Sequence, residues 1–394
     1  MYPPPSPSLS DATAKELDDQ FFTSDPFAYI RSRILALLSD DRPAFEGSAA
    51  EEFARLLGPS SVHYTHCDDR TVKLQIAVDA FALRHQVAET LLRLIHVALH
   101  HQDGRSHWVE LVDTPTRTID VIKENRSALD AQEDGGVELL RAALVSPENT
   151  LRIDLEPRHV ANSGPGRGSE PEEGSSTELI DRALDVHIGW INYAIRLFVR
   201  KDPDLDAAHN KFKHGMGLRP QDDVLSTITL TPPNSDGSVP LSSLTGDQAV
   251  NLFDGITTEF LSRASRKHGL ETTQIAMLPA PTLVEAAAMA HTLALLFHRA
   301  AVKHFANHEP HEGRSIPAHP GLLVEGPRPG TLRPTRPFAL RFPLTMPLRA
   351  NSGPEALLFW TNGHVNTMVF GERIRGVVVD DPHDRSPHNR PQVD

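Results

Sequence analysis

Cysteine is almost absent from this sequence, which has only Cys67 in 394 residues. A single cysteine cannot form an intrachain disulfide, and it excludes a CxxC-type metal site. No run of 18 or more apolar residues is present, and the first residues lack the basic and apolar segments of a signal peptide. These absences predict a cytoplasmic protein that does not cross a membrane.

Positive charge is also scarce. The chain has 39 Lys and Arg residues against 52 Asp and Glu, which gives a formal net charge of −13. Such a field repels nucleic acid, so an RNA partner would require a local basic patch. Only eight residues are lysine, and two of them, Lys211 and Lys213, lie within "AAHNKFKHGMGL" at 207–218.

Several common catalytic motifs are missing. The glycine-rich "SGPGRG" at 163–168 is not followed by GKS or GKT, so it is not a P-loop. The sequence has no GxSxG, no HExxH and no DxDxDG. No cofactor is therefore predicted.

Helical periodicity dominates what is present. Apolar residues recur at helical spacing in 26–39, 71–102, 178–200 and 281–306, and we expect further helices at about 246–268 and over 204–214. Arg84 lies near the apolar side of the 71–102 helix and is expected to pair internally with a carboxylate.

Strand patterns are fewer. The segments 149–157 and 224–233 resemble strands, and apolar runs between 338 and 379 flank Asn362-Gly363, a pair typical of a type I′ hairpin turn. The fold class predicted is mainly α, a helical bundle with a small C-terminal β element.

Composition divides the chain into segments. Residues 1–12 are rich in Pro and Ser and are predicted to be a disordered tail. A helical domain is expected over 13–308, interrupted by a flexible acidic break at about 161–177. Residues 309–381 read as a Pro/Gly-rich linker with a small β element, and 382–394 as a disordered tail.

The stretch 209–214, "HNKFKH", is the strongest candidate for chemistry. On a helix, Asn210 and His214 share a face, and so do His209 and Lys213. The window 196–219 holds six Lys and Arg residues against three Asp, so it could bind a phosphate beside an imidazole. The alternative is a solvated helix end whose histidine and lysine side chains cap backbone carbonyls.

This stretch resembles the motif of HEPN-type helical domains, which are helical bundles and often RNA-cleaving toxins or defence effectors. Asn210 and His214 match the Asn and His of the motif, whereas His209 stands where the family has Arg. The resemblance implies metal-independent RNA cleavage with His209, Asn210 and His214 as catalytic residues. It also implies a symmetric homodimer, and the missing Arg puts cleavage in doubt while leaving RNA binding.

Within that resemblance, Lys211 and Lys213 would bind the phosphate and partly replace the missing Arg. Lysine does this less well, because it is a point charge without the bidentate fork of arginine. His214 would assist proton transfer at the ribose 2′-hydroxyl or at the leaving oxygen.

Two further function classes stay open. One is a non-catalytic helical scaffold or interaction protein, which needs no special residues. The other is a metalloprotein, because four polar side chains on the 71–102 helix lie within about 60° of one another and could bind zinc or ferrous iron. Those four residues are His85, Glu89, His96 and His100.

Overall fold

The computed structural model describes residues 9–38, 68–101, 104–130, 141–142, 144, 176–199, 205–213, 217–229, 249–263, 270–307, 310, 314–324, 326–331, 339–343, 355–361, 364–370 and 379–380. These residues fall into two compact units, each assembled from three separated stretches of chain. The first unit takes residues 1–44, 79–201 and 279–336, and the second takes 45–78, 202–278 and 337–394.

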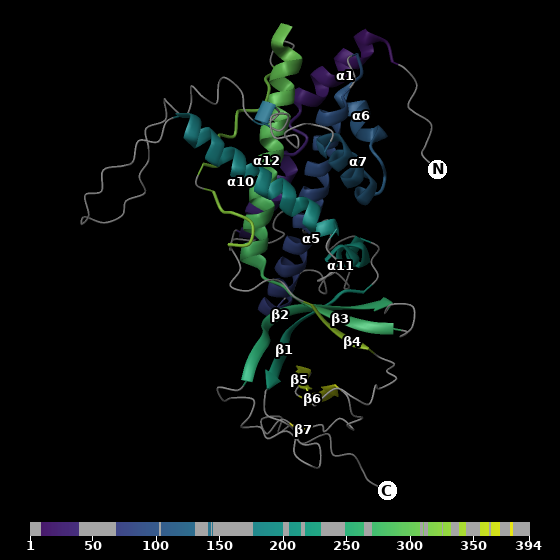
Figure 1. Ribbon diagram of the computed structural model, residues 1–394, viewed down its shortest axis with the longest axis vertical. Coiled ribbons are helices and arrows are strands. Elements are labelled where there is room, and N and C mark those ends of the chain that lie inside the picture. The colour runs from purple at the N-terminus through teal and green to yellow at the C-terminus, as the bar shows by residue number, and fades with distance from the viewer. Residues whose placement is uncertain are drawn as a thin grey trace, which may run out of the picture. The chain divides into compact units, whose positions relative to one another are not determined.

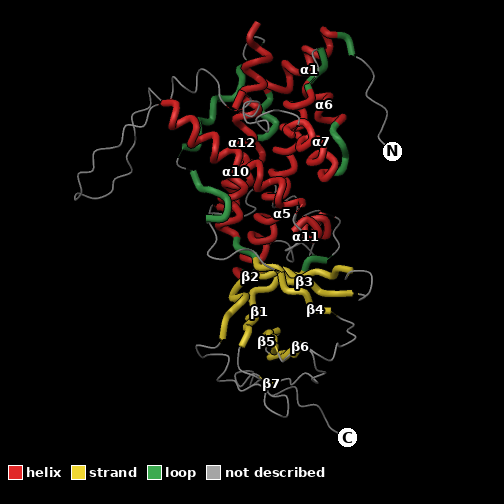
Figure 2. Tube along the Cα trace, viewed as in Figure 1, coloured by secondary structure: helices red, strands yellow, loops and turns green. Residues whose placement is uncertain are grey.

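The first unit is helical (Figures 1 and 2). A predominance of helix with an added antiparallel sheet confirms the fold class predicted from the sequence. The helices of this unit are α1 (Asp11–Thr23), α2 (Ala28–Leu38), most of α5 (Asp69–His100), α6 (His107–Asp113), α7 (Thr118–Asp130), α10 (Ser176–Val199), α12 (Pro279–His304) and the short 3₁₀ helix η3 (Phe305–Asn307).

Helix α12 is the centre of this unit and packs against α1, α2 and α10. Figure 1 shows α10 crossing α12. It begins at Pro279, where a missing backbone N–H costs nothing because the first turn has no acceptor for it. Met289 and Leu293 on α12 and Trp190 on α10 are completely buried. Helix α12 is long and apolar enough to cross a membrane. However, 61% of its most apolar 18-residue stretch is buried inside the protein, as in the core helix of a folded domain.

Helix α5 differs from the amphipathic helix that its sequence suggests. From Ala80 to Val97 most side chains are buried on every side, including Arg84 and, on the polar face, His85. Arg84 Nη1 donates to Glu285 Oε2 of α12 at 2.9 Å, and each side chain is only 2% exposed. The expectation of an internal ion pair for Arg84 is confirmed.

The second unit is built on an antiparallel sheet with the strand order β4-β3-β2-β1-β5-β6-β7 (Figure 2). Helix α11 (Leu205–Lys213) packs against β2 in the same unit. The strands are β1 (Arg219–Thr229), β2 (Ala249–Arg263), β3 (Leu270–Ala276), β4 (Ala339–Pro343), β5 (Glu355–Thr361), β6 (His364–Phe370) and β7 (Val379–Asp380).

One expectation from the sequence is wrong here. The segment 246–268, predicted as a helix, contains strand β2, which pairs with β1 and β3. The C-terminal strands belong to the same sheet as β1–β3, because β5 pairs with β1 and β4 pairs with β3. The first unit extends along the chain to residue 336.

Other expectations agree with the structure. Strand β1 covers most of the predicted strand at 224–233, and β5 and β6 pair so that Thr361 lies opposite His364. Helix α1 is a difference, because it begins at Asp11 with Ser10 as its N-cap, so the end of the predicted disordered tail 1–12 is helical. The strand expected at 149–157, the tail 382–394, Cys67 and the Asn362-Gly363 turn lie outside the described residues.

Candidate functional site

Helix α11 carries His209, Asn210, Lys211 and Lys213, as predicted, and these side chains differ in exposure. His209 is only 2% exposed, whereas Asn210 and Lys213 are exposed and Lys211 is half-buried. His214 lies outside the described residues. A buried imidazole at 209 cannot take the place of an arginine that reaches a phosphate in solvent.

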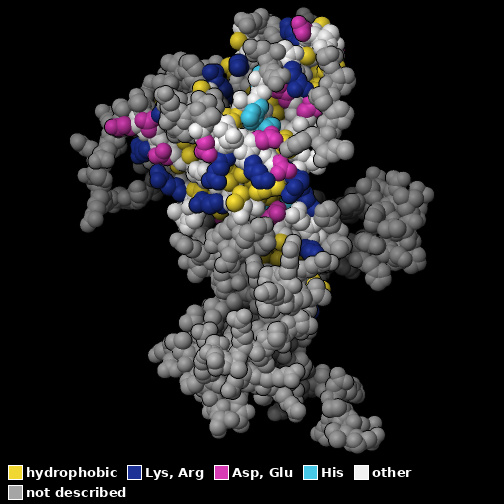
Figure 3. Space-filling view, turned by 45° about the vertical axis from the view of Figure 1, so that its right-hand side comes forward, with side chains coloured by type: hydrophobic (Ala, Val, Ile, Leu, Met, Phe, Trp, Pro, Cys, Tyr) yellow, Lys and Arg dark blue, Asp and Glu magenta, His cyan; other side chains and the backbone are white. Residues whose placement is uncertain are grey.

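The charges around α11 are partly neutralised within its own unit. Arg219 donates to Glu259 at 2.6 Å and Arg70 donates to Asp222 at 2.6 Å. On the face of the molecule in Figure 3, Lys and Arg side chains of the helical unit form a loose band across the lower part of the coloured surface, with Asp and Glu side chains beside it.

Three of the four candidate metal ligands on α5 are hydrogen-bonded to other groups. His85 Nδ1 lies 2.9 Å from the Phe81 carbonyl, and Glu89 accepts hydrogen bonds from Arg93 and Thr118. His96 Nδ1 donates to Asn125 at 3.0 Å, and its pKa is lowered because burial disfavours the charged ring. The His96 and His100 rings are 4.4 Å apart, but the described residues contain no group of three ligands suited to a metal ion.

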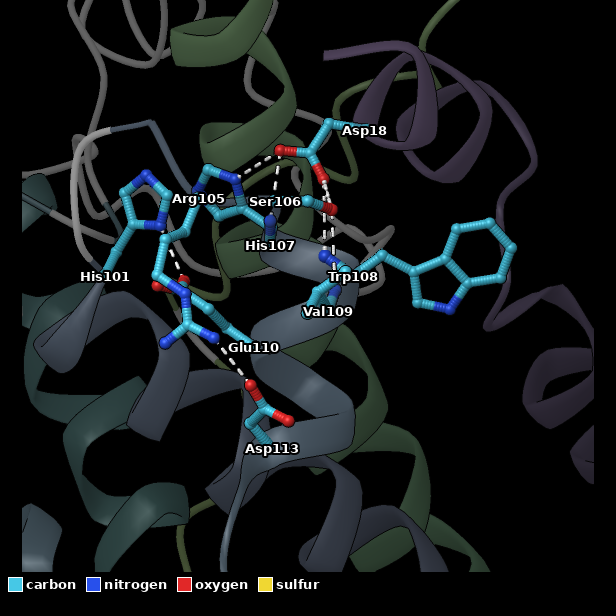
Figure 4. Close-up of polar contacts among 9 residues, drawn as sticks. All are labelled: Asp18, His101, Arg105, Ser106, His107, Trp108, Val109, Glu110 and Asp113. Atoms are coloured by element: carbon cyan, nitrogen blue, oxygen red, sulfur yellow. Dashed lines mark hydrogen bonds and ion pairs between the residues drawn. The ribbon is translucent and has the colours of Figure 1, made fainter. Parts of the chain in front are cut away.

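A cluster of imidazole–carboxylate pairs joins α1 to α6 (Figure 4). The Asp18 carboxylate accepts hydrogen bonds from Ser106 Oγ at 2.6 Å, His107 Nδ1 at 2.9 Å and the backbone N–H groups of His107 and Trp108. Desolvation raises the pKa of Asp18, but these hydrogen bonds outweigh it, so the pKa is lowered overall. Asp18 therefore acts as a cap on the first turn of α6.

A second pair in the same cluster links His101 Nδ1 to Glu110 Oε2 at 2.6 Å. The His101 and His107 rings stack with their centroids 3.8 Å apart. In Figure 4 the Trp108 indole points away from these rings, and it stacks on Phe21 at 5.7 Å. These contacts link α6 to α1 and to the end of α5, so we assign the cluster to holding α6 in place.

A groove in the helical unit is the site that sequence reasoning missed. It has a volume of about 700 Å³ and lies between α2, α12 and the segment 314–324, which we call the strap. Its wall is mainly apolar, and its polar side chains include His291, His319 and the Asp25–Arg31 ion pair. The apolar side chains include Ile30 and Ile34 of α2 and Leu293, Ala294 and Phe297 of α12.

Histidines attach the strap to the helices. His298 Nδ1 donates to the Pro317 carbonyl at 3.0 Å, and His291 Nε2 donates to the Gly321 carbonyl at 3.0 Å. The Leu323 N–H points at His187 Nε2 of α10 at 3.4 Å. The Pro/Gly-rich segment predicted as a linker is thus, over its described part, a wall of the helical unit.

Further along, residues 326–331 continue over α10. Trp190 Nε1 donates to the Pro327 carbonyl at 2.8 Å. A Cβ added at Gly189 would lie 3.4 Å from Pro329 Cδ, which is an ordinary van der Waals contact, so this segment packs directly on α10. The one available sequence signal was the seven-residue spacing of His291 and His298, which places both on one face of α12.

Comparisons with protein-family models, with curated proteins and with solved structures find no match to this chain. The candidate sites are therefore judged on their geometry.

Proposed function

We propose that the protein is a non-catalytic binding protein whose helical unit holds a small, largely apolar molecule in the groove. The single observation that carries this proposal is the groove itself, a half-open space of about 700 Å³ with a mainly apolar wall. Small-molecule sites are typically clefts of roughly 300–1,000 Å³ with a few convergent polar groups. The volume favours a small molecule over a folded partner.

The wall also indicates the chemistry of the ligand. Its middle is aliphatic and aromatic, from Ile34, Leu293 and Phe297, which suits an apolar body. Arg31, half-exposed and paired with Asp25, offers a guanidinium to an anionic group. We infer a ligand with an apolar body and one anionic or hydrogen-bonding group.

The experiment uses 1-anilinonaphthalene-8-sulfonate, which has an apolar ring system and one anionic group. We expect wild-type protein to bind it saturably at one site, measured by fluorescence titration. Ala294→Leu fills part of the groove and should weaken binding by about tenfold or more, the equivalent of about 1.4 kcal/mol. Ala300→Leu is the matched control, because Ala300 is also half-buried on α12 but does not line the groove.

Two results would contradict the proposal. One is binding that does not saturate, and the other is equal binding by the Ala294 and Ala300 variants. Circular dichroism on each variant confirms that the helical content is unchanged.

RNA binding through α11 is a second candidate. It is favoured by the accessible side chains of Asn210 and Lys213, with half-buried Lys211 between them, in the last turns of that helix. The homodimer implied by the HEPN resemblance belongs to this candidate. Burial of His209 favours binding without cleavage.

A further inference from the structure

Hydrogen-bond directions fix the protonation of the histidine that holds the strap on α10. Thr292 Oγ1 donates to the Ala288 carbonyl at 3.0 Å, so it accepts from His187 Nδ1 at 2.9 Å. His187 therefore carries its proton on Nδ1, and its Nε2 is the acceptor facing the Leu323 N–H. A proton added at His187 Nε2 would make this atom a donor that faces the Leu323 N–H, which is also a donor. The hydrogen bond between them would then be lost.

A second imidazole stacks against the first. The His187 and His291 rings are nearly parallel, with centroids 5.9 Å apart and an interplanar angle of 10°. His187 is completely buried, and His291 holds the Gly321 carbonyl of the strap. Burial lowers the pKa of both rings, and the neighbouring His291 further lowers that of His187, to about 3. Both imidazoles are neutral while the strap is docked.

The surrounding groups do not compensate a charge on this pair. Among the described residues, neither ring is hydrogen-bonded to a carboxylate. The titratable or charged side chains that line the groove with His291 are His319 on the strap and Asp25 and Arg31 across it, and His298 of α12 contacts the His319 ring. Glu285, on the same face of α12 as Thr292, is paired with Arg84. Asp25 is already paired with Arg31.

We propose that the strap is a proton-sensitive latch, which is docked while His187 and His291 are neutral and is released when they take up protons. Release removes one wall of the groove and frees its ligand, and this second step rests on the proposed function. The sign follows from linkage: the folded rings have pKa values below the ordinary 6.5, so docking is favoured above that pH and is weakened as the pH falls below it.

Linkage also sets the size of the effect. Each imidazole that is neutral when docked and free to titrate when released shifts the equilibrium by up to about tenfold per pH unit below 6.5. Two rings acting together shift it by up to about a hundredfold per pH unit.

The latch is tested by amide hydrogen exchange between pH 7.5 and 5, without ligand and corrected for intrinsic exchange rates. We expect protection at Leu323, whose N–H faces His187, to fall with pH while amides inside α12 stay protected. His187→Gln keeps an acceptor for the Leu323 N–H but cannot be protonated. In this variant the docking equilibrium should therefore change by up to about tenfold per pH unit, as expected for one titrating ring, instead of up to about a hundredfold. His85→Gln is the control, because His85 is equally buried in α5 and contacts Phe81 instead of the strap.

If a variant fails to fold, the pH dependence of hydrogen exchange in the wild-type protein is sufficient to test the latch. Strap protection that is independent of pH would overturn the latch, and so would simultaneous loss of protection in α12, which indicates unfolding of the whole unit. An unchanged pH dependence in His187→Gln would overturn the assignment to this histidine.

Control of the groove is tested separately with the same sulfonate probe, whose charge does not change in this range. Affinity that falls over the same pH window supports control by the strap. A strap that titrates while probe affinity stays constant overturns that control. Failure of the probe to bind at any pH contradicts the proposed function, whereas the exchange result for the strap stands without it.

Discussion

At the scale of single residues, the Arg84–Glu285 pair shows how charge is placed in this core. Both side chains are 2% exposed, and Arg84 Cζ also lies 5.2 Å from the centre of the Phe81 ring. Taking two charges out of water is costly, and their attraction offsets that cost only while both partners are present. The pair therefore fixes the register of α5 against α12 more than it adds stability.

This arrangement predicts a non-additive pair of substitutions. Arg84→Met leaves Glu285 buried without its counter-ion and should lower the free energy of unfolding by about 3–5 kcal/mol. Glu285→Leu added to it should recover most of that loss, because no unpaired charge remains. Urea unfolding followed by circular dichroism measures both.

The exposed pair Arg141–Asp181, at 2.6 Å, is the control for this comparison. Arg141→Met should cost no more than about 1 kcal/mol, since solvent screens surface ion pairs. A similar cost for Arg84→Met and Arg141→Met, or a double variant less stable than Arg84→Met alone, would show that burial does not govern the pair.

At the scale of elements, helix α6 depends on a cap from another helix. Its seven residues are too few to form a stable helix alone. The Asp18 carboxylate of α1 accepts hydrogen bonds from the first backbone N–H groups of α6. It also accepts hydrogen bonds from Ser106 Oγ and from the His107 ring. Each bond to the ionised carboxylate is stronger than one between neutral groups.

Substitution of this carboxylate should therefore loosen α6. Asp18→Asn replaces one acceptor oxygen by a donor that faces N–H groups, and we expect a loss of about 1.5–3 kcal/mol. The wild-type contribution is present above the ordinary pKa of 3.8 and is lost as the pH falls through the lowered pKa of the folded carboxyl. Fluorescence of Trp108, which is 42% exposed in α6, measures the change.

Asp11→Asn is a suitable comparison, because Asp11 lies in the exposed first turn of α1. It should change stability by less than about 1 kcal/mol. Equal effects of the two substitutions on Trp108 fluorescence, or no difference between wild type and Asp18→Asn at neutral pH, would contradict the capping role.

Which elements can be predicted from sequence follows from how local their causes are. The long helices were predictable, because their apolar residues repeat every three or four positions over many turns. Strand β2 was mistaken for a helix because Val250, Phe253, Ile256 and Phe260 also fit helical spacing. Pairing with β1 and β3 decides its conformation, and that pairing involves residues distant in sequence.

The groove was unpredictable for a related reason. Its wall combines α2, α12 and the strap, which are more than 250 residues apart at the extremes. Proline and glycine in the strap indicate a segment without regular structure, and they carry no information about docking. The hydrogen-bond partners of His187, His291 and His298 are distant in sequence, so only the three-dimensional structure identifies them.

At the scale of the whole molecule, the net charge and the local charge around α11 have opposite effects on the binding of RNA. The formal charge of −13 repels RNA, whereas Lys211 and Lys213 attract phosphate over a short range. At about 0.15 M ionic strength, charges beyond roughly 8 Å are largely screened. Any RNA binding through α11 is therefore a local effect that depends on few phosphate contacts.

This reasoning gives the RNA candidate a definite signature. Lys213→Ala should weaken binding to single-stranded RNA and lower the slope of log affinity against log salt by about 0.7, which corresponds to one lost phosphate contact. Lys303→Ala is the matched control, because Lys303 is an equally exposed lysine on α12. Filter binding over a range of salt concentrations, with EDTA present, measures both slopes.

Cleavage is tested in the same samples. His214→Ala should abolish any metal-independent cleavage without changing the melting temperature if the imidazole transfers protons to or from the RNA. Cleavage that survives this substitution would remove His214 from the site. Wild-type protein that neither cleaves RNA nor binds it in a salt-dependent way would exclude the HEPN-like function. Because α11 and the groove belong to different units, that result would leave ligand binding by the helical unit unaffected.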